Sequence, residues 1–212
     1  MSLKSSPIIE NGIIAGNIYD KYNSINPVAR WLMRGFIRHV DELVERSGAQ
    51  DIHEIGCGEG YLAAHLADVR HRRIRGSDFS RQVITTARKL HKNRQIHFQV
   101  RSIYDMVPGE DSGELIVCCE VLEHLENPRK ALCSLHQIAR PFCLLSVPNE
   151  PLWRILNCLR GRYLSALGNT PGHIHHWSRK QFLDLIGSLF DIVEVRFPIP
   201  WTMALCRRIE GR

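Results

Sequence analysis

The sequence predicts an α/β protein with a doubly wound, mostly parallel seven-stranded sheet, helices on both faces and an antiparallel C-terminal strand. Two observations predict this fold. Strand-like runs alternate with helix-like runs from residue 51 to residue 147, as in parallel sheets joined by helical crossovers. Two further strand-like runs, separated by Pro198 and Pro200, can form a closing antiparallel pair. A chain of 212 residues fits one domain, which we place at 1–212.

The first helix is predicted to begin at Asn26-Pro27 and to stop at Ser47-Gly48. Asn is a preferred N-cap, and Pro suits the first helical position. Apolar residues recur between these ends at helical spacing, namely Val28, Trp31, Leu32, Phe36, Val40, Leu43 and Val44. The preceding residues 1–25 are polar, and we expect them to be irregular.

Strands and helices then follow in turn. The predicted strands are 51–55, 73–77, 96–100, 114–119, 142–147, 192–197 and 201–206. The predicted helices are 61–69, 80–90 and 128–140, with a last one after Ser178, which has capping-box spacing to Gln181. The run at 114–119 is mostly apolar, which is typical of a strand covered on both faces.

Composition and charge narrow the class of protein. No apolar run approaches the roughly 20 residues that cross a bilayer, and the first 16 residues lack the features of a secretory signal. Seven cysteines, mostly in apolar segments and without CxxC spacing, predict buried free thiols rather than disulfides or a cysteine zinc site. We therefore expect a cytoplasmic protein without a membrane span. The net charge of +6 makes a nucleic-acid partner an open alternative.

The strongest motif is Glu54-Ile55-Gly56-Cys57-Gly58-Glu59-Gly60, between the first predicted strand and the next helix. Glycines allow a tight turn and close approach of a ligand. The helix N-terminus beyond them favours an anionic group, whereas the Glu54 carboxylate suits an ammonium group. A ligand with both groups is an amino acid, and the methionine part of S-adenosylmethionine (SAM) is one.

Asp78, twenty positions after Gly58, ends the second predicted strand, with Phe79 beside it. A carboxylate there can accept hydrogen bonds from both hydroxyls of a ribose, as in dinucleotide-binding folds. The dinucleotide fingerprint requires a third glycine where Tyr61 stands, and a pyrophosphate is a poor neighbour for Glu54. These points favour SAM over NAD as the cofactor.

Over about residues 17–208 the chain resembles the class I SAM-dependent methyltransferases, which have a Rossmann-like fold. The residues that carry the resemblance are Glu54, Gly56, Gly58, Gly60, Asp78 and the segment Glu120-Val121-Leu122-Glu123-His124. The resemblance implies that Gly56, Cys57, Gly58 and Gly60 line the cofactor, that Arg101, Ser102 and Ile103 flank the adenine, and that Glu120 lies nearby. It also implies that Tyr19 and Tyr22 lie over the cofactor as part of an N-terminal lid within residues 1–48; plain packing of both rings is the alternative.

The candidate catalytic residues are His124, Glu120, Glu123 and His173. His124 is our first candidate for the base that takes a proton from an oxygen nucleophile, since it follows the fourth strand. The four residues also resemble the metal-binding set of the small-RNA 3′-terminal 2′-O-methyltransferases, where a later His stands four residues before a Trp, as His173 stands before Trp177. That family's flanking acidic residues are absent here, so we assign no metal site. His175 and His176 we interpret as residues without a catalytic role.

Residues 148–177 are longer than a strand-to-helix link requires, so we expect them to cap the acceptor site; a helical hairpin packed on the sheet is the alternative. The sequence favours methyl transfer to an oxygen atom of a small-molecule or lipid-like acceptor. Two alternatives stay open: a metal-dependent RNA 2′-O-methyltransferase, and a SAM- or dinucleotide-binding module without turnover. The oligomeric state is left open.

Overall fold

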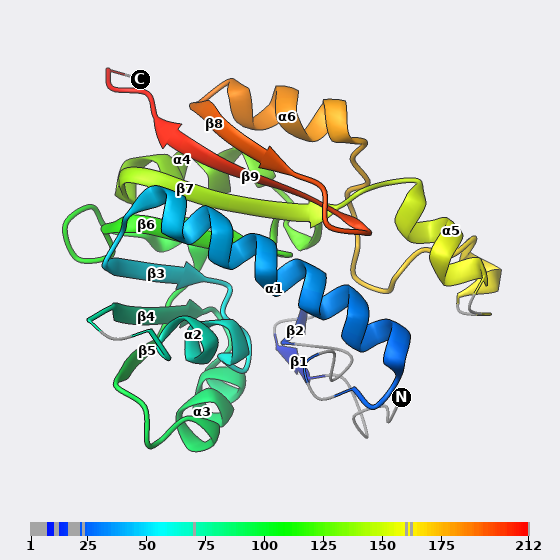
Figure 1. Cartoon of the computed structure of the whole chain (residues 1–212), viewed down its shortest axis with the longest axis horizontal. Coiled ribbons are helices and arrows are strands. Elements are labelled where there is room, and N and C mark those ends of the chain that lie inside the picture. Colours follow the sequence, from blue (N-terminus) through cyan, green and yellow to red (C-terminus); the bar gives the residue numbers. More distant parts are fainter. Residues whose placement is uncertain are drawn as a thin grey trace.

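A central sheet of seven strands runs through the computed structural model, which describes residues 8–10, 13–16, 22, 24–69, 71–159, 161 and 163–211. The strands are β3 (Asp51–Ile55), β4 (Arg73–Asp78), β5 (Ile96–Val100), β6 (Gly113–Cys119), β7 (Ala139–Pro148), β8 (Phe190–Arg196) and β9 (Trp201–Arg208). Their order across the sheet is β5-β4-β3-β6-β7-β9-β8. Figure 1 shows this sheet with helices on both sides.

The strand pairing confirms the predicted fold class. Strands β5, β4, β3, β6 and β7 pair in parallel, whereas β9 is antiparallel to both β7 and β8. Because β9 runs against its neighbours, its first residue lies at the edge where the parallel strands end: Trp201 is opposite Pro148. The carboxyl ends of the parallel strands and the start of β9 therefore share one edge, where α/β sheets bind ligands.

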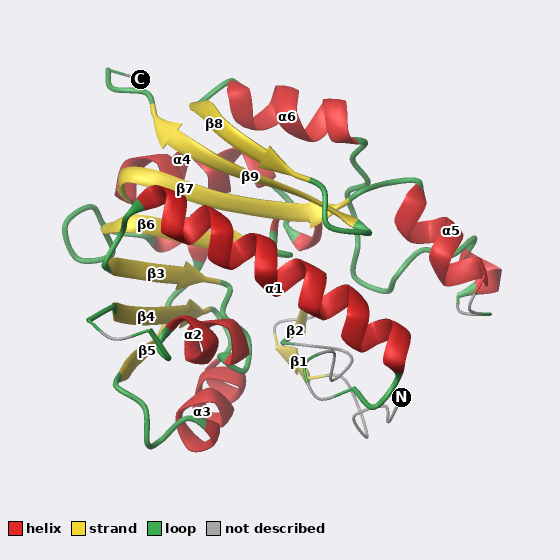
Figure 2. Cartoon of the chain, viewed as in Figure 1, coloured by secondary structure: helices red, strands yellow, loops and turns green. Residues whose placement is uncertain are grey.

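The helices are α1 (Pro27–Ser47), α2 (Tyr61–Leu66), α3 (Arg81–Leu90), α4 (Pro128–Ile138), α5 (Leu152–Leu159) and α6 (Arg179–Gly187), with short 3₁₀ turns η1 (Ile103–Asp105), η2 (Leu122–His124) and η3 (Leu164–Ala166). Figure 2 distinguishes helices from strands. One core cluster lies under α1, α2 and α3 and includes Phe36, Leu62 and Ala87. A second cluster lies under α4 and α6, with Leu132 and Phe182. The sheet is thus covered on both faces.

The predicted helix caps are present. The Asn26 side chain accepts hydrogen bonds from Val28 N and Ala29 N, and Pro27 occupies the first turn of α1. Gly48 ends α1 in a left-handed conformation. Ser178 and Gln181 form a reciprocal capping box at the start of α6.

Some element bounds differ from the prediction. Helix α2 ends at Leu66 rather than at residue 69, because the chain turns there to reach β4. Strand β7 begins at Ala139 and α4 ends at Ile138, so the boundary between them lies earlier than expected. The N-terminal segment was expected to be irregular, but it contains a small antiparallel hairpin of β1 (Ile8–Glu10) and β2 (Ile13–Ala15). Three-residue strands give too short an alternation to detect in a sequence.

Every helix in the described ranges is too short or too polar to cross a membrane.

Candidate functional site

The glycine loop after β3 is tied to the end of β4. Gly56 N and Cys57 N both donate to Ser77 O, at 2.7 and 2.9 Å. Gly56, Gly58 and Gly60 all have positive φ, between 53° and 78°. At Gly56 an added Cβ would also lie 2.4 Å from Cγ2 of Val121, which belongs to the segment after β6. A side chain at Gly56 is therefore excluded by both backbone conformation and space.

Asp78 at the end of β4 contacts this loop directly. Its Oδ2 accepts a hydrogen bond from Gly58 N at 3.1 Å, and its Oδ1 accepts one from Ser80 N at 3.0 Å. The side chain is almost completely buried. Burial raises the pKa of the Asp78 carboxyl to about 6, against the opposing effect of the two N–H donors. The structure thus brings together the two sequence features on which the cofactor prediction rests.

Three buried carboxyl groups surround the loop: Glu54, Glu59 and Asp78. Two of these carboxylates affect Cys57. Burial, and then the charges of Glu54 and Asp78, raise the pKa of the Cys57 thiol well above its usual range. Cys57 is therefore a protonated packing residue rather than a nucleophile. The concentration of acidic groups suits a ligand that carries positive charge.

Tyr22 lies over the start of α2. Its ring stacks on Tyr61 with centroids 5.0 Å apart. Burial, followed by the charges of Glu54, Cys119 and Glu120, raises the pKa of the Tyr22 hydroxyl well above its usual range. The hydroxyl is thus within electrostatic reach of acidic groups from both the β3 and β6 ends. Tyr19, its predicted companion, is outside the described residues.

The β1–β2 hairpin reaches the same region. Glu10 accepts hydrogen bonds from Ser80 Oγ at 2.5 Å and from Arg81 N at 3.3 Å, at the N-terminus of α3. A Cβ added at Gly16 would lie 3.0 Å from Glu59 Oε1, so the end of the hairpin packs closely on the glycine loop. The hairpin therefore covers the corner that contains Asp78.

The segment after β5 lies next to Asp78, because Arg101 N donates to Asp78 O at 2.9 Å. The Ser102 hydroxyl accepts from Tyr104 N and caps η1, and Ile103 is buried. The Arg101 guanidinium pairs with Glu110 and Asp111, so its contacts are with that acidic turn. Phe79 is partly exposed.

Glu120, directly after β6, is held by two residues from neighbouring strands. Its carboxylate accepts a hydrogen bond from Ser146 Oγ at 3.1 Å and one from the indole Nε1 of Trp201 at 2.5 Å. Glu120 has a φ of 61°, a left-handed conformation that is uncommon for a residue with a side chain. The sequence analysis did not single out Trp201, although the predicted antiparallel direction of its strand puts that residue at the site.

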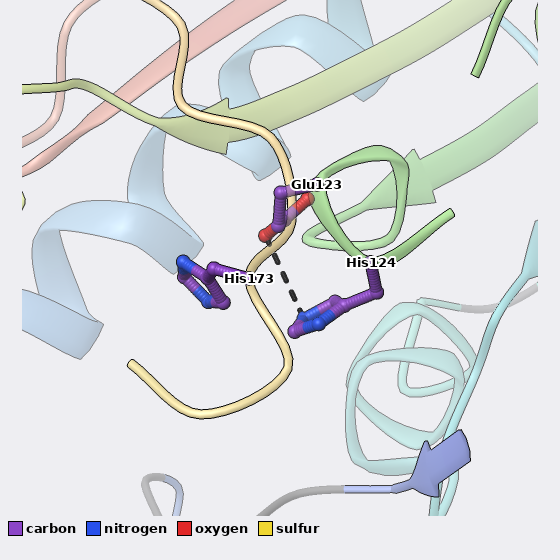
Figure 3. Close-up of side chains that lie close together, drawn as sticks. All are labelled: Glu123, His124 and His173. Carbon is purple, nitrogen blue, oxygen red and sulfur yellow. Dashed lines mark ion pairs between the residues drawn. The ribbon is translucent and has the colours of Figure 1, made fainter. Parts of the chain in front are cut away.

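Glu123, His124 and His173 converge beside η2, as Figure 3 shows. Glu123 and His173 are buried, and one ligand atom from each of the three residues lies within 4.8 Å of the others. Oε1 of Glu123 is 4.0 Å from Nε2 of His124. The two imidazole centroids are 4.8 Å apart. The structure therefore brings together three of the four predicted catalytic residues, from two segments nearly fifty positions apart.

The hydrogen bond of His124 determines which ring nitrogen carries a proton. Nδ1 of His124 lies 2.9 Å from the carbonyl oxygen of Gly172. A carbonyl can only accept, so Nδ1 must be the donor. In the neutral ring the lone pair then lies on Nε2, which faces Glu123.

The backbone of residues 170–175 is fixed to η2. Ile174 N and His175 N both donate to Glu123 O, at 2.9 and 3.1 Å, and His173 N donates to Thr170 O. His175 stacks on Trp177 and its Nε2 lies 2.9 Å from Leu125 O, which gives this residue a packing role. His176 lies 3.9 Å from the Glu150 carboxylate.

A row of aromatic rings connects His173 to α1. His173 stacks on Trp153 of α5, Trp153 lies against Trp201, and Trp201 packs edge-on against Phe36. Trp153 is anchored by its indole N–H, which donates to Thr170 Oγ1 at 2.8 Å. The row forms one side of the region between the β6 and β7 ends.

Comparison with known proteins agrees with this geometry. Residues 53–146 match the family model described as a methyltransferase domain. This segment is therefore similar to methyltransferase domains. The match includes Glu54, Asp78 and His124 and stops before Trp153, His173 and Trp201.

Curated relatives match parts of this chain. An O-methyltransferase of Penicillium expansum is 32% identical over 104 residues, 46% of this chain and 38% of that protein. A ubiquinone biosynthesis O-methyltransferase of Xanthomonas euvesicatoria is 24% identical over 163 residues, 73% of this chain and 63% of that protein. The chain thus spans less than two thirds of the length of these curated relatives.

The fold extends well beyond the matched segment. The crystal structure of magnesium protoporphyrin IX methyltransferase from Synechocystis, with bound S-adenosylhomocysteine (SAH), superposes with a TM-score of 0.67 over 90% of this chain and 94% of that one, at 19% identity. The likeness in fold to this structure therefore extends over most of the chain.

Proposed function

We propose that this protein is a SAM-dependent methyltransferase that methylates a small-molecule or lipid-like acceptor at oxygen. The observation that carries the proposal is the pairing of a cofactor-type corner with a base: Asp78 hydrogen-bonded to the glycine loop, and His124 with its lone pair on Nε2. The curated relatives, which include O-methyltransferases, support the same class.

The residues around the glycine loop fit SAM. Glu54, Glu59 and Asp78 supply buried negative charge for a ligand with an ammonium and a sulfonium group. Asp78 has two carboxylate oxygens for the ribose hydroxyls, and Ile103 offers an apolar surface beside it for a purine. When bound, SAM supplies an electrophilic methyl group. Tyr22 and the hairpin residue Glu10 cover this corner, and covering it keeps water out.

His124 is the proposed base. An acceptor hydroxyl must lose its proton as the new C–O bond forms, and Nε2 of His124 takes that proton when the ring is neutral. The buried Glu123 carboxylate, 4.0 Å away, then stabilises the imidazolium. His173 and Glu120 we assign to positioning: His173 packs on His124, and Glu120 joins β6 to β7 and β9.

The segment between β7 and α6 is the proposed acceptor cap. It contains α5 and η3; His173 lies next to His124, and Trp153 stacks on His173. Aromatic walls of this kind suit a phenol or another apolar acceptor. We also propose a cytoplasmic location, in keeping with the seven free cysteines.

A screen of acceptors with SAM labelled in its methyl group tests the proposal. We expect transfer to phenolic or lipid-like hydroxyl compounds, unaffected by EDTA. Calorimetry with SAM, SAH and NAD tests the cofactor separately: binding of SAM and SAH but not NAD is expected. Binding of NAD alone would overturn the proposal, and SAM binding without transfer to any acceptor would favour a module without turnover.

A second candidate is a metal-dependent RNA 2′-O-methyltransferase, which the cluster of Glu123, His124 and His173 favours. One carboxylate and two imidazoles within 4.8 Å are a reasonable ligand set for a divalent transition-metal ion. Glu120, the fourth residue of that set, is held instead by Ser146 and Trp201. Stimulation of methyl transfer to RNA by Mn²⁺, with loss in EDTA, would establish this candidate in place of the first.

A further inference from the structure

Large apolar side chains are exposed in two groups around the carboxyl-end edge of the sheet. The first group stands at the start of α1 and consists of Ile25, Val28 and Trp31. The second belongs to α5 and the turn after it and consists of Ile155, Leu159, Leu164 and Leu167. The exposed fractions reach 87% for Ile25, 78% for Leu159 and 72% for Leu167, so these side chains contribute little to the core.

The two groups flank the proposed site. Helix α5 follows the carboxyl end of β7, and α1 packs on β7 and β9 with its first turn directed to the same end of the molecule, as Figure 1 shows. Trp201 connects the helices, since its ring contacts Phe36 of α1 and Trp153 of α5. The two groups therefore stand at or beside the two helices that Trp201 connects.

The surface of α5 is hollowed. A groove of about 450 Å³ is lined by Pro151, Arg154, Ile155, Cys158, Leu159 and Leu167. Its walls are almost entirely apolar apart from Arg154. This is the composition of a surface for acyl chains with a cation at its rim, rather than for a polar ligand.

Positive charge lies next to the apolar groups. Arg30, Arg34 and Arg38 stand four residues apart along α1 and border one hollow, which is also lined by Tyr22, Met33, Ile37 and Asp41. Trp31 stands beside this row, and an aromatic ring beside basic side chains is the usual arrangement of a helix at a membrane interface. The net charge of the whole chain is +6.

We propose that this face, formed by Ile25, Val28, Trp31, Ile155, Leu159, Leu164 and Leu167, docks on the surface of a bilayer that contains anionic lipids. The apolar side chains enter the interface, and the arginine row of α1 binds the lipid headgroups. The proposal rests on the proposed function, because it lets a lipid-like acceptor pass from the bilayer to His124.

Vesicle co-sedimentation of the full chain tests the docking without SAM or acceptor. We expect binding to vesicles of phosphatidylcholine with 30% phosphatidylglycerol, about tenfold weaker binding to phosphatidylcholine alone, and weakening in high salt. The variant Leu159→Glu with Leu167→Glu should lose at least tenfold in partitioning, as should Arg30→Gln with Arg34→Gln. Leu90→Glu with Val107→Glu, also exposed but away from this face, is the matched control and should bind like the wild type.

Equal binding by the α5 variant and the control, or no binding of the wild type to anionic vesicles, would overturn the proposal. Two other occupants of this face would each give a different signature. If a second copy of the chain covers the face, the α5 substitutions should change the mass measured by light scattering. If RNA covers it, the chain should bind RNA instead of vesicles. Either signature without vesicle binding also overturns it. Calorimetry with SAM on the α5 variant keeps this outcome separate from the proposed function, because the exposed leucines lie outside the glycine-loop corner.

Discussion

The indole Nε1 of Trp201 donates a hydrogen bond to Oε2 of Glu120 at 2.5 Å, which joins the first residue of β9 to the residue that follows β6. The same carboxylate accepts from Ser146 of β7, so one side chain links three adjacent strands at the site. The bond fixes Glu120 beside η2, where the proposed base stands.

We expect Trp201→Phe to keep the ring contacts with Phe36 and Trp153 but to lose this hydrogen bond. Hydrogen bonds to charged groups contribute about 1.5–3 kcal/mol, so the free energy of unfolding should fall by that order. The kcat should fall while SAM affinity is retained. Urea unfolding and calorimetry measure the two quantities. Trp153→Phe, which leaves Glu120 bonded, is the matched control, and an equal loss of kcat in both would show that ring packing alone matters.

Asp78 should make SAM binding depend on pH. Its pKa in the free protein is about 6, and only the ionised carboxylate can accept from both ribose hydroxyls. At pH 5 we therefore expect roughly tenfold weaker SAM binding than well above pH 6. Asp78→Ala should weaken binding at neutral pH and flatten this dependence. Calorimetry between pH 5 and pH 8 measures it, and an unchanged profile in the variant would assign the dependence to another group.

The same shift predicts a stability trend with a definite sign. The folded-state pKa of Asp78 lies above its ordinary value of 3.8, so the folded protein binds this proton more tightly than the unfolded chain. The contribution of Asp78 is therefore fully present below pH 4 and is lost as the pH rises through 6. In urea titrations, the unfolding free energy of the wild type minus that of Asp78→Ala should therefore decrease as the pH rises from about 4 to about 6.

His124→Ala should leave SAM affinity unchanged and lower kcat, by about 10²-fold or more if a general base has been removed. His39→Gln is the control, because Nδ1 of His39 lies 2.7 Å from Gly35 O within α1. Single-turnover assays with labelled SAM measure the step. Retained turnover in His124→Ala would remove this residue from the mechanism.

Glu10→Gln tests the hairpin cover. The hydrogen bond from Ser80 Oγ lowers the pKa of Glu10, so the contact is present above about pH 4.5 and weakens as the pH falls below it. We expect faster SAH release and faster amide exchange in β1 and β2 for the variant at pH 7. Glu45→Gln, on exposed α1 surface, is the control. Unchanged release would mean that the hairpin does not limit exit.

Gly56→Ala should be destabilised by two separable causes. Its φ of 75° disfavours alanine, and the new Cβ would lie 2.4 Å from Val121. Adding Val121→Ala should restore the part due to the clash and leave the backbone part, of the order of 1–3 kcal/mol. A double-mutant cycle in urea measures both, and additive effects would show that the contact is unimportant.

The sequence predicted the fold and the glycine-loop corner because both depend on local patterns. Alternating strand and helix runs fix a parallel sheet, and the loop and Asp78 each follow a strand whose end is evident from residues nearby. The partners of Asp78, namely Gly58 N and Ser80 N, follow from the same short segments.

Other parts of the site depend on contacts between distant segments. Trp201 at the start of β9 reaches across β7 to Glu120, which follows β6. Glu10 contacts Ser80, which lies seventy positions later in the sequence. The residues next to Glu10 in the sequence do not indicate that Ser80 is its partner. The approach of His173 to His124 was expected only through a family resemblance, and its physical cause is the pair of bonds from Ile174 N and His175 N to Glu123 O.

The placement of β9 between β7 and β8 has a consequence for biosynthesis. Residues 201–208 are synthesised after all the remaining strands of this sheet. Strand β9 must nevertheless insert between two strands that were made earlier, β7 and β8. Until it does, Glu120 lacks its indole donor and β8 has no neighbour to pair with. A nascent or prematurely terminated chain would therefore expose open strand edges to the cell's quality-control machinery and would be unable to complete its reaction centre.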